Sequence, residues 1–330
     1  MLGLREAGQS SFPLLRSFTL LSIGTAFLQC VPIANGFQTD ESGGPGHFRA
    51  TADLVLLDVS AQNSEGRYIK DLVPKNFSIF ADGKGQPITY FANADSAAAI
   101  GLVVDNSGSM RTKRVGVNAA GVTFAGISNP HDEFFVINFN DRVIRGLPPS
   151  VPFTDNIQLL RSALYQANPV GQTALYDSIL YALHHITYSS LERKTLIVVS
   201  DGRDTCSRLT KRELLDKIAA SRTTIYTIGF ADDENSDLDR RFLQKMSRVS
   251  GGQFFALRDL AGIAPTLHAI SQEIRSRYTL GFTPTGVIDS RRVHELRVVA
   301  RQDSTLLKTH GRRAYSSDVS ENNIRERSSP

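Results

Sequence analysis

The chain has 330 residues, 41% of them hydrophobic and 21% charged, which is enough for one large domain or two smaller ones with packed cores. The formal net charge of +4 is spread along the sequence, without the dense lysine and arginine block that a nucleic-acid footprint requires. We therefore expect no nucleic-acid partner.

The N-terminal segment has the features of a secretory signal. Arg5 and Arg16 precede the apolar stretch "FTLLSIGTAFLQCVPIANGF", and Ala34 and Gly36 place small residues before a cleavage point after Gly36. This pattern predicts a signal peptide over residues 1–36 and an extracytoplasmic protein that is secreted, periplasmic or associated with the cell envelope. The alternative is an uncleaved membrane anchor, since the apolar stretch is almost long enough to span a bilayer.

Cleavage after Gly36 would remove Cys30 and leave Cys206 as the only cysteine of the mature chain. A single cysteine excludes an internal disulfide, and it supplies too few ligands for a structural zinc site.

The polar, Gly-rich residues 37–50 are typical of a linker, and residues 51–96 then carry strand signals. Within the second segment "NFSIFADGKGQPITYF" alternates apolar and polar residues on both sides of the turn at Asp82-Gly83, which predicts a hairpin. Three or four strands are too few to close a core alone, so this segment needs partner strands from elsewhere in the chain.

Residues 97–276 alternate apolar runs of strand length with helical patterns. The predicted strands are "AAIGLVVD", "EFFVINFN", "KTLIVVSD", "TTIYTIGF" and "GGQFFAL". Helical spacing predicts three buried helix faces, which carry Val115, Ala119 and Val122, then Leu175, Ile179, Leu183 and Ile186, then Ile263, Leu267, Ile270 and Ile274. Apolar strands that alternate with amphipathic helices predict an α/β fold, a Rossmann-like, doubly wound and mostly parallel sheet.

Strand signals return over residues 277–315, in "RYTLGF", "HELRVVARQ" and "STLLKTHG". We expect these strands to pair with those of residues 51–96 in a small β-sandwich that flanks the α/β domain. Residues 316–330 have almost nothing to bury and are predicted to be a disordered tail.

Oxygen-bearing side chains follow two of the predicted parallel strands. Asp105, Ser107 and Ser109 come directly after "GLVV", and Asp201 follows "TLIVVS". Because ligands of open α/β sheets bind at the carboxyl ends of the strands, we expect these residues to meet there. Thr173, in a loop that directly precedes a predicted helix, is expected to join them. Two carboxylates and three hydroxyls suit a hard divalent cation, with Mg²⁺ preferred and Mn²⁺ or Ca²⁺ as alternatives.

This set resembles the metal-ion-dependent adhesion site of von Willebrand factor type A domains, whose motif is Asp-x-Ser-x-Ser followed by a distant Thr and a distant Asp. The resemblance covers about residues 97–276. It implies that Ser107, Ser109 and Thr173 contact the metal directly or through water, and that Asp105 and Asp201 do so according to conformation. The segment "LVLLDVSAQNSEGRYIKDLVPKNFSIFADGKGQPITYF" is also similar to one that precedes the A domain in VWFA-related proteins described from acidobacteria.

Other interpretations stay open for the same residues. Asp105 and Asn106 could have the purely structural role of capping the following helix, and Asp201-Gly202 could simply form a turn. A second alternative is a metal-dependent hydrolase or phosphotransferase that uses the Asp105 site. A serine nucleophile would need a base such as His131, His184 or His185, and no G-x-S-x-G elbow surrounds Ser107 or Ser109. A phosphate-transferring aspartate usually has a second acid at the position of Ser107, and the sequence has no P-loop. A metal-free structural or assembly scaffold is the third alternative.

We predict a protein that is not an enzyme and that binds a protein, or another ligand with an acidic group, through the divalent ion. An aspartate or glutamate of the partner would fill a coordination position that the chain leaves open.

Overall fold

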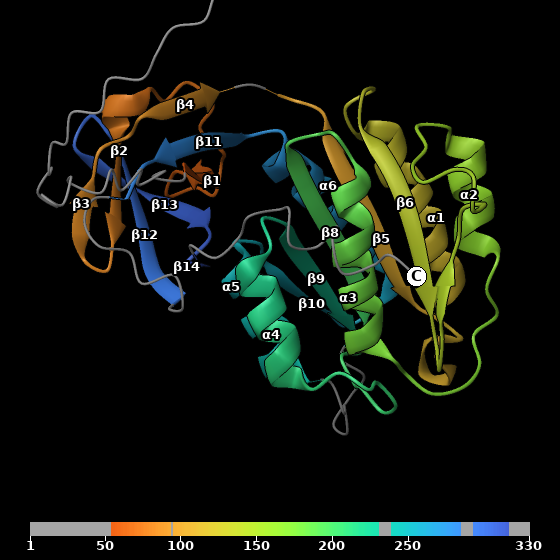
Figure 1. Cartoon of the computed structure of the whole chain (residues 1–330). Helices are drawn as coiled ribbons and strands as arrows, with labels where there is room; N and C mark the ends of the chain where they lie inside the picture. Colours follow the sequence, from red (N-terminus) through yellow and green to blue (C-terminus); the bar gives the residue numbers. More distant parts are fainter. Residues whose placement is uncertain (1–53, 94, 231–238, 285–292, 317–330) are drawn as a thin grey trace, which may run out of the picture. The chain divides into compact units, whose positions relative to one another are not determined.

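The computed structural model describes residues 54–93, 95–230, 239–284 and 293–316 (Figure 1). The predicted signal peptide, the predicted linker and residues 317–330 of the predicted tail lie outside the described residues. Within the described ranges, no helix combines the length and apolar character needed to cross a membrane.

The α/β part is built on a six-stranded sheet. Its strands lie side by side in the order β10 (Phe254–Leu257), β9 (Thr224–Phe230), β8 (Arg193–Ser200), β5 (Ala98–Asp105), β6 (Glu133–Phe139) and β7 (Val143–Arg145). The pairs from β10 to β6 are parallel, whereas the short edge strand β7 runs antiparallel to β6. The mostly parallel sheet agrees with the prediction, but β7 was not predicted because its three residues follow β6 after a tight turn.

Six α-helices accompany this sheet in two groups. The helices α1 (Arg114–Ile127), α2 (Ile157–Tyr165) and α6 (Ile263–Ile274) pack together, as do α3 (Leu175–His185), α4 (Lys211–Ala220) and α5 (Arg240–Ser250). Four 3₁₀ turns complete the described helical elements: η1 (Pro74–Asn76), η2 (Gly108–Met110), η3 (Ile186–Tyr188) and η4 (Leu260–Gly262). The apolar faces predicted for α3 with η3 and for α6 are buried.

The face predicted for α1 is wrong. Val115 is 70% exposed, and the helix instead buries Val117 and Phe124 together with the charged Arg114. The spacing of apolar residues predicted the wrong face because a charged residue, Arg114, occupies one of the inward positions of the helix.

Gly101 in the middle of β5 allows close packing across the sheet. A Cβ atom at this position would lie 2.3 Å from Cζ of Phe135 and 2.5 Å from Cδ2 of Leu196. We expect Gly101→Ala to lower the free energy of unfolding by about 1–3 kcal/mol, because both neighbours must leave their rotamers. Urea denaturation would measure this, with Gly126→Ala as the control, since a Cβ there meets no atom within 4 Å. Equal effects of the two substitutions would contradict the packing argument.

The strands of the two chain ends form a second, antiparallel sheet of eight strands. Its order is β3 (Lys84–Gln86), β2 (Phe77–Ala81), β12 (Val293–Gln302), β13 (Thr305–Gly311), β1 (Val55–Gln62), β11 (Arg277–Phe282) and β4 (Tyr90–Asn93), while β14 (Ala314–Ser316) pairs with β12. N-terminal and C-terminal strands therefore pair as predicted, although β14 was not predicted.

The antiparallel sheet folds over its own core. Phe77 on β2 lies 5.0 Å from Tyr278 on β11, measured between ring centroids, and 6.0 Å from Phe91 on β4. Strands β2 and β11 are four steps apart in the sheet, so a flat sheet would separate them by about 19 Å. The strands therefore curve so that β2 and β11 face each other across a shared core.

Candidate metal centre

Asp105 is the last residue of β5 and its side chain is fully buried. Its Oδ1 accepts a hydrogen bond from the backbone N–H of Ser107 at 2.8 Å, and its Oδ2 accepts one from the hydroxyl of Ser200 at 2.6 Å. Ser200 ends the neighbouring strand β8, so the carboxylate bridges the carboxyl ends of two adjacent parallel strands.

The two serines of the Asp-x-Ser-x-Ser sequence extend from this carboxylate towards Asp201. The hydroxyls of Ser107 and Ser109 lie 3.0 Å apart, and the Ser109 hydroxyl donates to Oδ2 of Asp201 at 2.5 Å. Asp105 and Ser107 are buried, whereas Ser109 is exposed and Asp201 is half-buried. The cluster therefore runs from the core to the surface.

The Thr173 loop lies against the same turn. Backbone bonds join the N–H of Gly108 to the carbonyl of Gly171 at 3.3 Å and the N–H of Val170 to the carbonyl of Asn106 at 2.9 Å. On its other side, the N–H of Thr173 donates to the hydroxyl of Thr205 at 2.9 Å, beyond the end of β8. The structure thus brings all five predicted residues into one region, from three separate segments of the chain.

Burial raises the pKa of Asp105 to about 6, and the charge of Asp201 adds to this effect. The carboxylate is costly in its ionised form because the effect of burial exceeds that of the hydrogen bonds that it accepts from Ser107 and Ser200. A divalent ion would compensate this charge, and the donors present are all hard oxygens. Among the residues that the structure describes, no group of three or more His, Cys, Asp and Glu could hold a metal, so the hydroxyls are essential to such a site.

A buried polar cluster behind the turn escaped the sequence analysis. Arg114 donates through Nε to Asn106, through Nη1 to Asn118 and through Nη2 to Oδ1 of Asn138 at 2.7 Å and the carbonyl of Leu164 at 2.6 Å. The amide of Asn106 in turn donates to Oδ1 of Asn138 at 3.2 Å. Arg114 therefore holds the residue that follows Asp105. The sequence did not indicate this role for Arg114, because an isolated arginine at the start of a helix is usually exposed.

We expect Arg114→Leu to lower the free energy of unfolding by about 2–4 kcal/mol, because the asparagine side chains and a carbonyl lose a buried donor. Arg161→Leu is the matched control, since Arg161 is exposed on α2. Urea denaturation of both variants checks the effect. A loss below about 0.5 kcal/mol, as for an ordinary surface change, would contradict a positioning role for Arg114.

Two other polar residues of the α/β part, Asp204 and His185, have structural roles. Asp204 accepts hydrogen bonds from the N–H of Tyr176 at 3.1 Å and from the hydroxyl of Ser207 at 2.5 Å, and so supports the start of α3. His185 is buried against Phe135, and its Nε2 lies 2.8 Å from the carbonyl of Pro152.

Comparison with known proteins identifies part of the chain. Residues 100–203 match the family model of the von Willebrand factor type A domain. No match to a curated protein was found.

Three solved structures illustrate the likeness in fold. A von Willebrand factor type A protein from Catenulispora acidiphila is 14% identical, with a TM-score of 0.50 and 74% of each chain covered. The vWF domain of the type V pili tip protein Mfa5 from Porphyromonas gingivalis is 14% identical, with a TM-score of 0.44 and coverage of 54% of this chain and 95% of that one. An aerotolerance-related membrane protein from Bacteroides fragilis is 15% identical, with a TM-score of 0.44 and coverage of 54% and 98%.

The family match spans β5 to β8 and includes the region where Asp105, Ser107, Ser109, Thr173 and Asp201 meet. Residues 100–203 therefore carry the match of this chain to the von Willebrand factor type A (VWA) domain.

Proposed function

We propose that the protein binds an acidic group of a protein partner through a divalent metal ion held by Asp105, Ser107, Ser109, Thr173 and Asp201. The observation that supports this most directly is the buried carboxylate of Asp105, with its pKa raised to about 6, at the base of a chain of hydroxyls that leads to the surface. Mg²⁺ is the preferred ion because the donors are hydroxyl and carboxylate oxygens, and Mn²⁺ or Ca²⁺ could replace it.

The cluster suits binding better than catalysis. The exposed Ser109 and the half-buried Asp201 open it to the surface, where a partner's aspartate or glutamate could fill a free coordination position on the metal. His185, the buried candidate base, is bonded to a backbone carbonyl and packed among aromatic rings instead of facing Asp105. We therefore propose an interaction module that acts outside the cytoplasm, as the N-terminal sequence and the resemblance to VWFA-related proteins from acidobacteria suggest.

Mn²⁺ offers a direct test, because its bound waters enhance the relaxation of solvent protons. We expect Mn²⁺ to bind the protein and a short glutamate-containing peptide to reduce this enhancement, as its carboxylate displaces water from the metal. The same peptide with glutamine in place of glutamate is the control.

Two outcomes would count against the proposal. Absence of Mn²⁺ binding would favour the metal-free scaffold, in which the cluster only caps helices and forms turns. Metal binding without any response to the glutamate peptide would leave a metal site that does not recognise acidic groups, and the partner hypothesis would then be abandoned.

A further inference from the structure

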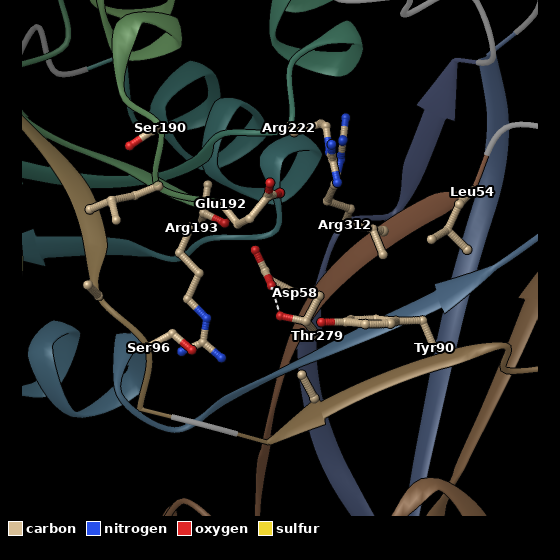
Figure 2. A pocket seen from close by; sticks show the side chains of 15 residues that line it. Leu54, Asp58, Tyr90, Ser96, Ser190, Glu192, Arg193, Arg222, Thr279 and Arg312 are labelled. Carbon is tan, nitrogen blue, oxygen red and sulfur yellow. Dashed lines mark hydrogen bonds between the residues drawn. The ribbon is translucent and has the colours of Figure 1, made fainter.

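A second candidate site lies at the opposite ends of the parallel strands from Asp105. A cavity of about 770 Å³ is lined by the first residues of β8 and β9, Arg193 and Thr224, and by residues of β1, β4 and β11 from the antiparallel sheet (Figure 2). Because Asp105 stands at the carboxyl end of β5, the cavity is separate from the candidate metal centre. Its volume falls within the range of small-molecule sites, roughly 300–1,000 Å³.

One corner of this cavity holds two positively charged side chains, Arg222 and Arg312. Arg312 is only 9% exposed; one of its terminal nitrogens donates to the carbonyl of Ala219 at 2.5 Å, while its buried Nε has no hydrogen-bond partner. Arg222 lies beside it and makes no hydrogen bond or ion pair with any described residue (Figure 2). Burial, aided by repulsion from Arg222, lowers the pKa of Arg312 to about 10, and the charge of Asp58 offsets this only in part.

The other charged residues of the lining do not neutralise that corner. Asp58 accepts the hydroxyl of Thr279 at 2.8 Å, and Arg193 donates to the backbone carbonyls of Ile274 and Arg277. Glu192 also lines the cavity. Within the described ranges, none of the three lining arginines lies within ion-pair distance of an acid, so an added anion would be the first ion-pair partner of Arg222 and Arg312.

The remaining wall is apolar and incompletely covered. Leu54 and Tyr90 are 47% and 46% exposed, which places them among the large hydrophobic side chains that the described fold leaves uncovered. Both line this cavity, and Leu56, Ala92 and Leu191 continue the same lining. A ligand with an apolar body would cover this surface and would gain affinity from each methylene that it buries.

We propose that the cavity binds a small organic acid with an apolar body, such as a medium-length fatty acid. Its carboxylate would pair with the guanidinium groups of Arg222 and Arg312, and its chain would lie along Leu54, Leu56 and Tyr90. Charge complementarity at one corner and uncovered apolar surface beside it define this class, because a purely apolar ligand would leave the arginines unpaired and a small anion would leave the wall exposed.

Calorimetric titration with octanoate, octanol and acetate tests both parts of this ligand. EDTA is present throughout, so that carboxylate binding to a metal at Asp105 makes no contribution. We expect octanoate to bind at least tenfold more tightly than octanol and than acetate. Equal affinity for octanoate and octanol would overturn the role of the arginines, and equal affinity for octanoate and acetate would overturn the role of the apolar wall.

Arg222→Glu is the decisive variant, because Arg222 is exposed and its replacement leaves the core intact. We expect it to weaken octanoate binding at least tenfold while octanol binding stays unchanged. Arg212→Glu, an equally exposed charge reversal on α4 outside the cavity, should leave octanoate binding unchanged. Unchanged octanoate binding in Arg222→Glu, or equal losses in both variants, would overturn the site.

Discussion

Asp105→Asn will make the metal-free protein more stable at pH 7 and will abolish its stabilisation by divalent metal. The carboxylate is buried and its pKa is raised from 3.8 to about 6, so the folded state carries an ionised group that it disfavours. Each pKa unit corresponds to about 1.4 kcal/mol, which sets an upper bound of roughly 3 kcal/mol on the gain from removing the charge. Asparagine fits the site because its oxygen can accept from the N–H of Ser107 and its amide can donate to the hydroxyl of Ser200.

The pH dependence has a definite sign. Since the folded-state pKa of Asp105 lies above its unfolded value, the folded state binds more protons between about pH 4 and pH 6. The stability that comes from the protonated form is fully present below pH 4 and is lost as the pH rises through about 6. In EDTA, the free energy of unfolding of the wild type should therefore fall over this window relative to that of Asp105→Asn.

Urea denaturation in EDTA, at intervals from pH 4 to pH 7, measures both effects, and a second series with Mg²⁺ measures the response to metal. A ligand at one hundred times its dissociation constant should stabilise the wild type by about 2.7 kcal/mol and leave Asp105→Asn unchanged. Asp216→Asn, an exposed change on α4, should behave as the wild type. Lower stability of metal-free Asp105→Asn, or an equal Mg²⁺ response in both proteins, would contradict a cation site at Asp105.

The sequence predicted the parts of this site that depend on strand ends, and missed the parts that depend on distant packing. Asp105 and Asp201 could be placed together because apolar runs mark where β5 and β8 stop, and parallel strands share an edge. The contribution of Ser200 was not predicted, since its hydroxyl reaches Asp105 only through the pairing of these strands. Arg114 was missed for a related reason: its partners come from four places in the chain, and no local pattern records them.

The fold shows the same division. Alternating apolar strands and helices were enough to predict the α/β class. Strand patterns predicted that residues 51–96 pair with residues 277–315. Which strands face each other, as β2 and β11 do, was not predictable, because it depends on how Phe77, Tyr278 and Phe91 pack in three dimensions.

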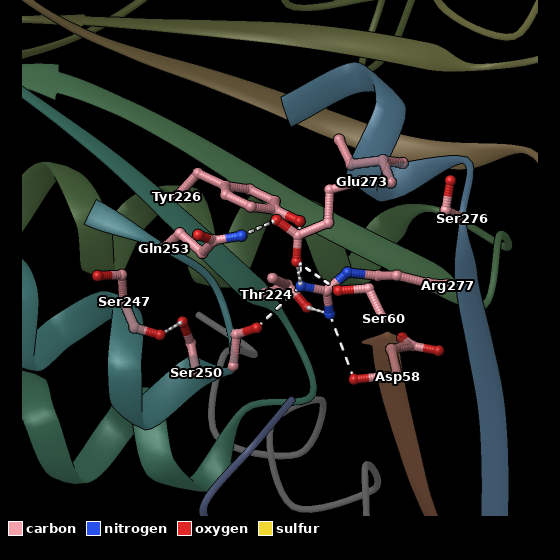
Figure 3. Close-up of polar contacts among 12 residues, drawn as sticks. Asp58, Ser60, Thr224, Tyr226, Ser247, Ser250, Gln253, Glu273, Ser276 and Arg277 are labelled. Atoms are coloured by element: carbon pink, nitrogen blue, oxygen red, sulfur yellow. Dashed lines mark hydrogen bonds and ion pairs between the residues drawn. The ribbon is translucent and has the colours of Figure 1, made fainter. Parts of the chain in front are cut away.

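Arg277→Met will be among the most destabilising changes in the protein. Glu273 at the end of α6 and Arg277 at the start of β11 are both buried, and their charged groups lie 2.8 Å apart (Figure 3). The carboxylate of Glu273 also accepts from Ser60 on β1 and from Gln253, at 3.0 and 2.6 Å. The guanidinium of Arg277 donates to the hydroxyl of Tyr226 on β9 at 3.0 Å. The pair therefore joins the antiparallel sheet to the six-stranded sheet.

Removal of one partner leaves the other charge buried and unpaired, which costs about 3–5 kcal/mol. We expect Arg277→Met and Glu273→Met each to lose that much, and the double variant to lose less than the sum, because no unpaired charge remains. Arg275→Met is the control on the same turn: its partner Asp95 lies 2.7 Å away, but both side chains are more than one-third exposed, so the loss should stay below about 1 kcal/mol. Urea denaturation of the wild type and of these four variants measures the losses. Additive losses in the double variant would show that the two charges act independently, whereas a recovery specific to the double variant would identify them as the electrostatic link through which α6 continues into the antiparallel sheet.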